Sequence, residues 1–319
     1  MIDSVLNQTY KNWNLILIDD GSTDRSGAVC DRYVNEKVRV IHNVNMGQVA
    51  ARVDGIKCAT GDYTLVLDAD DKIYNNYLEK ANEILNNYEY DVVMFPYEIC
   101  DAELKPSGRL SSIPDKVGEM SRLEVLSWII QTTSHGLVDK VIRTSMIQKG
   151  SVEAPTEKLK VNGDYALIIP VMCQIDKAFF SPEPMYCYRV LSTSTSHAYT
   201  FQHLIDTDFV SQKVEEVLIK HCIYDEELKK LVNIAYLKMI SFMTRGLFEK
   251  KKYYLKDFDK LKKQEFYKKS IKFEKKQYFS NLDFCQLKLM RKFTILLRPF
   301  IKMYIALIKV KQFIMNSVY

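Results

Sequence analysis

The sequence that decides the fold is LILIDDGSTD at residues 15–24, followed by YTLVLDADD at residues 63–71. In each stretch a short apolar run ends in a cluster of carboxylates. Such runs are typical of buried parallel strands, and open α/β sheets bind ligands at the carboxyl ends of their strands. Carboxylates gathered there repel one another unless a cation neutralises them. The pattern therefore predicts a metal ion and a polyanionic ligand.

Strand and helix patterns alternate along the first part of the chain. Residues 98–120 contain two prolines and two glycines, which predicts a hairpin or a loop excursion. The alternation predicts an α/β fold with a mostly parallel sheet and helices on both faces. Further strand patterns cover residues 38–41 and 91–95, and helix patterns cover residues 47–59, 77–88, 121–132 and 164–175.

Charge is distributed unevenly between two parts of the chain. Residues 250–319 contain 19 Lys and Arg against 5 Asp and Glu, whereas residues 1–249 carry a net charge of −9. Beyond residue 200 the pattern predicts helices and no strand. We therefore predict an α/β domain over residues 1–200 and a basic, helical C-terminal extension over residues 201–319.

Composition excludes several other classes of protein. With 319 residues, of which 47% are hydrophobic, the chain can bury a sizeable core. Its seven cysteines are an odd number without a CxxC pair, which argues against a disulfide framework and a zinc site and favours a reducing cytosol. No apolar run has membrane-spanning length, and the residues after Met1 do not resemble a signal peptide.

Four motifs occur in a fixed order along the first part of the chain. They are SVLNQTY at 4–10, DDGSTD at 19–24, NMG at 45–47 with Ala51 and Arg52, and LDADD at 67–71. In this order and spacing they resemble the motifs of family 2 glycosyltransferases with the GT-A fold, and the resemblance extends over roughly residues 1–200. It implies an inverting transferase that moves a sugar from a nucleotide-diphosphate donor, a UDP-sugar, to an acceptor hydroxyl.

The resemblance implies a role for four of these residues. Asp20 is expected to contact the base of a uridine nucleotide, and Arg52 to add positive charge beside the nucleotide sugar. Asp68 and Asp70 form a DxD element, in which both are expected to hold Mn²⁺ or Mg²⁺ against the diphosphate and Asp68 also contacts the nucleotide sugar. Taken singly, each motif has an alternative interpretation as a solvated turn, a helix cap or a surface residue.

A further carboxylate, Asp164, resembles the family's catalytic base. In the family this Asp ends an acidic pair, whereas Gly163 precedes it here. A carboxylate base takes the proton of the acceptor hydroxyl as that oxygen attacks the anomeric carbon, and a single displacement inverts this centre. The alternative is that Asp164 only caps the following helix. Three additional candidates, for which a structural role is the alternative, are Lys140, His135 and His197.

The basic extension predicts contact with an anionic membrane surface. Four cations lie on one face of an apolar helical pattern, as in helices that lie in a membrane interface. The alternative is a tail helix that packs on the catalytic domain or on another subunit. We see no nucleic-acid recognition motif and expect no nucleic-acid partner. These four cations are Arg291, Arg298, Lys302 and Lys309.

Together with the family resemblance, the basic extension predicts that the protein lies in the bacterial cytoplasm, peripheral on the inner face of the cell membrane. Its expected acceptor is a lipid-linked oligosaccharide or a growing surface polysaccharide. The family's first strand, which ends in a Pro-x-Tyr-Asn-like turn, has no counterpart in the sequence. A missing central strand leaves unpaired edges on both of its neighbours. A misassigned start, a truncated gene or an inactive chain is therefore expected, and the alternative function is a catalytically inactive, membrane-associated remnant or interaction subunit.

Overall fold

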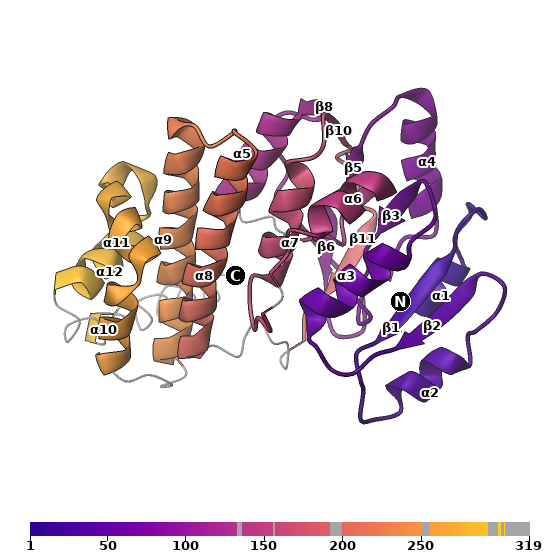
Figure 1. Cartoon of the computed structure of the whole chain (residues 1–319), viewed down its shortest axis with the longest axis horizontal. Helices are drawn as coiled ribbons and strands as arrows, with labels where there is room; N and C mark the ends of the chain where they lie inside the picture. Colours follow the sequence, from indigo (N-terminus) through magenta and orange to yellow (C-terminus); the bar gives the residue numbers. More distant parts are fainter. Residues whose placement is uncertain are drawn as a thin grey trace, which may run out of the picture. The chain divides into compact units, whose positions relative to one another are not determined.

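The computed structural model divides into two compact units. The first comprises residues 1–192 and 216–223, and the second comprises residues 193–215 and 224–319. Figure 1 shows the chain coloured along the sequence, with its helices and strands labelled. The structure describes residues 1–132, 136–155, 157–191, 200–249, 255–292, 299–300 and 303.

The first unit has the predicted α/β composition, and its main strands and helices lie where the sequence patterns predict them. Its strands are β1 (Leu15–Asp19), β2 (Val38–His42), β3 (Tyr63–Leu65), β4 (Lys72–Ile73), β5 (Val92–Met94), β6 (Tyr97–Cys100), β7 (Pro106–Leu110), β8 (Gly118–Ser121), β9 (Lys140–Arg143), β10 (Lys177–Phe180) and β11 (Tyr186–Arg189). Its helices are α1 (Ile2–Leu6), α2 (Ser26–Asp31), α3 (Gln48–Cys58), α4 (Tyr77–Asn87), α5 (Arg122–Thr132), α6 (Thr144–Ser151) and α7 (Gly163–Met172).

The strands form mixed sheets rather than the mostly parallel sheet that was predicted. Among the described residues the sheet orders are β1-β2, β3-β9-β5-β10-β8 and β4-β11-β6-β7. β1 runs parallel to β2 and β10 parallel to β5, but β9 runs antiparallel to both β3 and β5. The sequence pattern missed β9 because this four-residue strand begins with a buried Lys and has no long apolar run.

β1 and β3, which precede the two acidic clusters, belong to different sheets. β1 pairs with β2, β3 pairs with β9, and each has one edge without a strand partner in the described part of the chain. Leu15 of β1 and Leu65 of β3 nevertheless pack against one buried cluster, which includes Val93 and Phe95. The absence of a strand between them stays a prediction from the sequence.

A buried helix, α7, passes through the first unit and carries Asp164 in its first turn. All residues from Tyr165 to Met172 are buried, so this helix is apolar on every side. α7 packs against α3, α5 and α6. Because its surroundings are fixed by packing, the first turn of α7 is a rigid support for a functional side chain.

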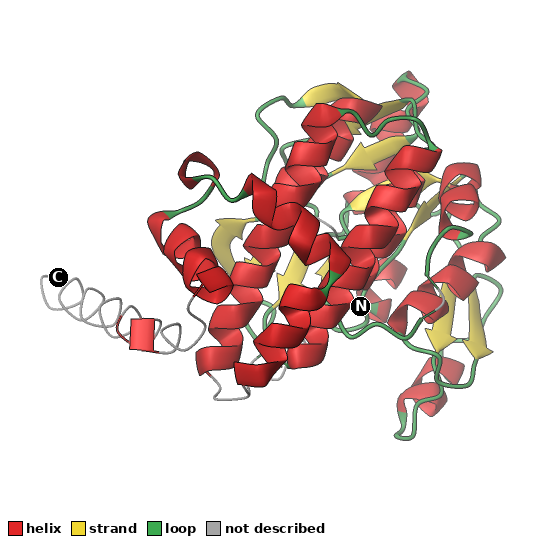
Figure 2. Cartoon of the chain, turned by 60° about the vertical axis from the view of Figure 1, so that its left-hand side comes forward, coloured by secondary structure: helices red, strands yellow, loops and turns green. Residues whose placement is uncertain are grey.

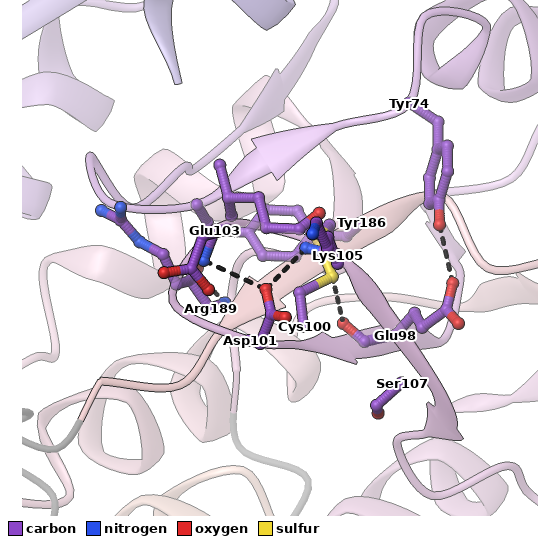
Figure 3. The surroundings of a disulfide bond; sticks show 12 residues. Tyr74, Glu98, Cys100, Asp101, Glu103, Lys105, Ser107, Tyr186 and Arg189 are labelled. Atoms are coloured by element: carbon purple, nitrogen blue, oxygen red, sulfur yellow. Dashed lines mark hydrogen bonds between the residues drawn. A yellow bond between two sulfur atoms is a disulfide. The ribbon is translucent and has the colours of Figure 1, made fainter.

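A disulfide joins Cys100 on β6 to Cys187 on β11 (Figure 3). Their Cα atoms are 5.9 Å apart and 87 positions separate them in the sequence. This pair corrects the expectation drawn from the cysteine count. The count could not reveal it, because the two residues become neighbours only through the parallel pairing of β6 with β11.

Every described element after residue 200 is helical, as predicted (Figure 2). Asp208 is buried in the second unit, where it accepts hydrogen bonds from the Tyr236 hydroxyl and the Tyr267 backbone N–H. No helix among the described residues has the length and apolar character needed to cross a membrane. The helices are α8 (Phe201–Lys220), α9 (Glu226–Glu249), α10 (Leu255–Lys263), α11 (Glu265–Ser270), η2 (Ile271–Phe273), η3 (Lys276–Tyr278) and α12 (Asn281–Lys292).

Several predicted residues lie outside the part that the structure describes. Of the four cations of the predicted stripe, Arg291 is exposed near the end of α12. The predicted residues that lie outside the described part are Arg298, Lys302 and Lys309 of the stripe, together with the candidates His135 and His197.

Candidate functional site

Three of the predicted residues meet in one ion-pair cluster in the first unit. Arg52 Nη2 donates to Asp68 Oδ1 over 2.7 Å, and Arg52 Nη1 donates to Asp164 Oδ1. The Arg52 side chain is 7% exposed, whereas those of Asp68 and Asp164 are 25% and 28% exposed. One planar guanidinium thus neutralises two carboxylates that would otherwise repel each other.

Local sequence explains why Arg52 points inward. Val49, Arg52 and Ile56 are the buried residues of α3, and their spacing of three and four places them on one helix face. The opposite wall is the first turn of α7. A Cβ atom at Gly163 would lie 2.5 Å from Val49 Cγ2. The departure of Gly163 from the family's acidic pair therefore has a local cause, because α3 fills the space that a side chain would need.

The environment of Asp164 suits a proton acceptor. Burial raises the pKa of Asp164, and the positive charges of Arg52 and Lys140 act against that rise. Burial lowers the pKa of Arg52, but the carboxylates of Asp164 and Asp68 outweigh it and the net shift is upward. Arg52 therefore stays charged, and the basicity of Asp164 is increased.

Asp68 and Asp70 lie in the turn that follows β3. The backbone N–H of Asp71 closes this turn on the Asp68 carbonyl, and Asp70 is exposed. No cluster of three or more His, Cys, Asp or Glu side chains suited to a metal occurs within the described ranges. Two carboxylates nevertheless fit Mg²⁺ or Mn²⁺, since such ions take hard oxygen ligands and fill their remaining positions with phosphate and water.

Asp71, the last carboxylate of LDADD, is a buried part of this region. It accepts hydrogen bonds from the Tyr186 hydroxyl over 2.6 Å and from the Arg189 backbone N–H over 2.7 Å. Burial raises its pKa to about 6. Asp71 thus attaches β11 to the DxD turn. The third carboxylate of LDADD was a signal for it, but its partner Tyr186 lies 115 positions away.

Tyr188 also lies among these carboxylates and was missed by the sequence analysis. Burial raises its pKa, and the charges of Asp71, Asp68, Asp70 and Asp164 raise it further. Its ring packs against that of Tyr97 on β6, with 5.3 Å between the ring centroids. The phenol hydroxyl therefore stays protonated and can donate a hydrogen bond at the edge of the cluster.

Lys140 is a fully buried cation on β9. Its Nζ donates to the Gly136 carbonyl over 2.6 Å and to Asp139 Oδ1 over 2.5 Å. The same Nζ lies 5.9 Å from the centroid of the Trp128 ring. These partners account for the buried charge, so Lys140 acts on Asp164 through the electrostatic field of its ammonium group.

Asp20 lies apart from the Arg52 cluster. Its two carboxylate oxygens accept hydrogen bonds from the backbone N–H groups of Met46 and Gly47, each over 2.8 Å. Gly47 directly precedes α3 and has a φ of 94°, which glycine adopts without strain. Asp20 thus holds the turn that begins α3, and Arg52 follows this turn on the same helix.

Comparison with known proteins gives several consistent matches. Residues 1–141 match glycosyl transferase family 2. The glycosyltransferase GlyG of Streptococcus pneumoniae is 39% identical over 99 residues, which are 30% of this chain and 33% of GlyG. YibD of Escherichia coli, an uncharacterised glycosyltransferase, is 27% identical over 203 residues, which are 61% of this chain and 58% of YibD. The chain thus covers less than two thirds of the length of either relative.

Solved structures extend the comparison to almost the whole chain. The crystal structure of residues 1–349 of Staphylococcus aureus TarS in complex with UDP-GlcNAc has a TM-score of 0.66 to this chain. The match covers 95% of this chain and 86% of the TarS chain, at 18% sequence identity. At this identity the match shows the fold, and it confirms the predicted GT-A class together with a helical C-terminal part.

Proposed function

Because residues 1–141 belong to glycosyl transferase family 2, we propose that this chain transfers a sugar from a UDP-sugar to a hydroxyl of an acceptor. The observation that carries the proposal is the contact of Arg52 with both Asp68 and Asp164. It links a carboxylate of the DxD turn to the carboxylate expected to act as base. The proposed donor end and the proposed acceptor end of the reaction centre would thus lie within the span of one guanidinium.

The donor is proposed to lie between Asp20 and the DxD turn. The UDP-GlcNAc that is bound in the TarS crystal structure supports a nucleotide sugar as the donor class. Asp68 and Asp70 would hold Mn²⁺ or Mg²⁺, which supplies a positive charge that stabilises the departing diphosphate. Arg52 would add a fixed positive charge beside the donor, because its own burial leaves little freedom to move.

Asp164 is proposed to act as general base. Its carboxylate takes the proton of the acceptor hydroxyl while that oxygen attacks the anomeric carbon from the side opposite the diphosphate. The proton stays on Asp164, and the bond to the diphosphate oxygen breaks with inversion at the anomeric carbon. The upward pKa shift of Asp164 supports this role, since a more basic carboxylate accepts a proton more readily.

The acceptor is proposed to be a lipid-linked oligosaccharide or a growing surface polysaccharide at the inner membrane face. Support comes from the second unit, where short helices after residue 254 expose many ammonium groups, which an anionic bilayer attracts. Packing of the extension on another subunit is the competing explanation. The exposed lysines are Lys260, Lys263, Lys268, Lys272, Lys275, Lys276 and Lys288.

Two measurements on the full chain test the proposal. Calorimetry with UDP and a panel of UDP-sugars, with and without Mn²⁺, should show metal-dependent binding in the micromolar to millimolar range. Absence of nucleotide binding at millimolar concentration would reject the proposal. Flotation with anionic and with neutral vesicles tests the membrane contact, and equal recovery with both vesicles would reject it. Vesicle binding without nucleotide binding would instead favour the inactive remnant.

A further inference from the structure

Three side chains form a hydrogen-bonded chain beside the Asp20 turn, in a part of the first unit that the proposed reaction does not use. His42 Nδ1 lies 2.8 Å from Asp19 Oδ2, and His42 Nε2 lies 3.1 Å from Asp31 Oδ1. Asp19 ends β1, His42 ends β2 directly opposite it in the parallel register, and Asp31 ends α2. These hydrogen bonds therefore join the ends of β1, β2 and α2 at one corner of the first unit, which consists of Asp19, Asp31 and His42.

This corner determines where the Asp20 turn lies. Asp19 Oδ1 accepts the backbone N–H of Ser22 over 3.0 Å, and the Asp19 carbonyl accepts that of Asn43 over 2.8 Å. α2 approaches so closely that a Cβ atom at Gly27 would lie 2.7 Å from Asp19 Oδ2. The Asp19 side chain is consequently only 9% exposed. Because Asp20 directly follows Asp19 in the chain, the contacts that fix Asp19 also constrain the position of Asp20.

The two-sided contact of His42 requires a protonated ring. A neutral imidazole carries one N–H and donates to one carboxylate, whereas an imidazolium donates to both. The hydrogen bonds to Asp19 and Asp31 raise the pKa of His42. Two other titratable groups face this corner, because Cys30 on α2 lies in the field of Asp19 and Asp31, and Asp24 lies in that of Asp19. Neither supplies a positive charge, so His42 is the group that can offset Asp19 and Asp31.

We propose that His42 is a positioning residue for nucleotide binding, whose imidazolium form holds Asp19 and thereby sets Asp20 for the base of the nucleotide. This inference rests on the proposed function, in which Asp20 contacts the base. When the ring loses its proton, one of the two carboxylates loses its hydrogen-bond donor, and His42 holds Asp19 less firmly. The nucleotide therefore binds more tightly to the protonated form, and by linkage the bound nucleotide raises the pKa of His42.

The test compares wild-type protein with His42→Gln, whose amide keeps a donor but cannot change charge. UDP affinity is measured by calorimetry without metal from pH 5.5 to 8.5 in both proteins. The phosphate of UDP titrates equally in both, so only the difference between them counts. We expect wild-type affinity to fall about fivefold more than that of the variant as pH rises, a coupling at the low end of the usual range.

NMR titration of the His42 ring in wild-type protein gives an independent readout. Saturating UDP should raise the pKa of His42 by about 0.7, which is the same fivefold coupling seen from the other ligand. A His42 pKa that UDP leaves unchanged overturns the inference, and this result stands even where His42→Gln does not fold. UDP binding with one common pH profile in both proteins overturns it too, and leaves the proposed function intact. No UDP binding at any pH, either without metal or after addition of Mn²⁺, rejects both.

Discussion

The two carboxylate centres of the first unit are built in opposite ways. At the first centre Arg52, which is 7% exposed, joins Asp68 and Asp164, and 112 positions separate the guanidinium from the latter. At the second centre His42, which is 48% exposed, joins Asp19 and Asp31 within one stretch of 24 residues. The first centre uses a permanent charge and tertiary packing, whereas the second uses a titrating charge and local structure.

The two centres therefore differ in the substitutions that they tolerate. A buried guanidinium between two carboxylates forms a fixed ion-pair network. Removal of one member leaves a buried charge without its partner, which is strongly destabilising. An exposed histidine between two carboxylates forms an adjustable support, whose strength follows pH. Substitutions at the first centre should therefore change catalysis and stability strongly, and those at the second should change affinity mildly.

The largest effect is expected from Asp164→Asn. Without a carboxylate to accept the proton, UDP release from a UDP-sugar should slow by about 10² to 10⁴-fold, while UDP affinity stays within a few fold. The matched control is Asp176→Asn, since Asp176 is an exposed carboxylate paired with Arg122. A rate for Asp164→Asn equal to that of the control would show that Asp164 is not the base and serves only as an ion-pair partner of Arg52.

The next largest effect is expected from Arg52→Gln. Two partly buried carboxylates would lose their shared cation, which should lower the free energy of unfolding by about 3 kcal/mol, the low end for a broken buried pair because Asp68 and Asp164 stay partly hydrated. Urea unfolding followed by tryptophan fluorescence measures this loss. Both tryptophans of the chain, Trp13 and Trp128, lie in the first unit, so the signal reports on that unit alone.

Arg52→Lys is the companion variant. It keeps the charge but not the planar fork that reaches two carboxylates, so it should recover only part of the lost stability. Full recovery with Lys would mean that charge alone matters and that the two-sided geometry of Arg52 does not.

A smaller effect is expected from Asp70→Asn, which should remove the metal-dependent part of UDP binding. We expect UDP affinity in Mn²⁺ to fall at least about tenfold, to the value that wild-type protein shows without metal, since even outer-shell changes cost this much at metal sites. Calorimetry with and without Mn²⁺ measures it. The pKa of His42 should not change in this variant, because Asp70 belongs to the other centre. An unchanged effect of Mn²⁺ would remove Asp70 from the metal site.

The smallest effect is expected from Asp31→Asn. Asp31 is more than half exposed, so its pair with His42 should contribute little to stability and the melting temperature should stay close to that of wild type. NMR should nevertheless show a lower pKa of His42. Because folding raises this pKa above its ordinary 6.5, the contribution of His42 to stability is complete below pH 6.5 and is lost as pH rises through the folded value. An unchanged His42 pKa would mean that Asp31 takes no part in the second centre.

Sequence reasoning predicted more residues of the first centre than of the second. It predicted Asp20, Arg52, Asp68, Asp70 and Asp164 as site residues through a family resemblance, and the structure brings Arg52, Asp68 and Asp164 together. It missed Asp71, because a carboxylate in an acidic turn has the same sequence signature whether it is buried or solvated. His42 was missed as well, although it directly follows the strand predicted at residues 38–41, because its partner Asp19 lies on the adjacent strand.

The features that the sequence could predict by itself depend on residues that are close together in the chain. The alternation of apolar runs with acidic turns, the α/β class and the helical nature of the second unit depend on residues a few positions apart, and periodicity reports such relations directly. Tertiary structure alone decided that Arg52 lies between two carboxylates, that Cys100 meets Cys187 and that β9 makes the sheet mixed. These features depend on residues tens of positions apart, and only the folded chain brings such residues into contact and removes them from water.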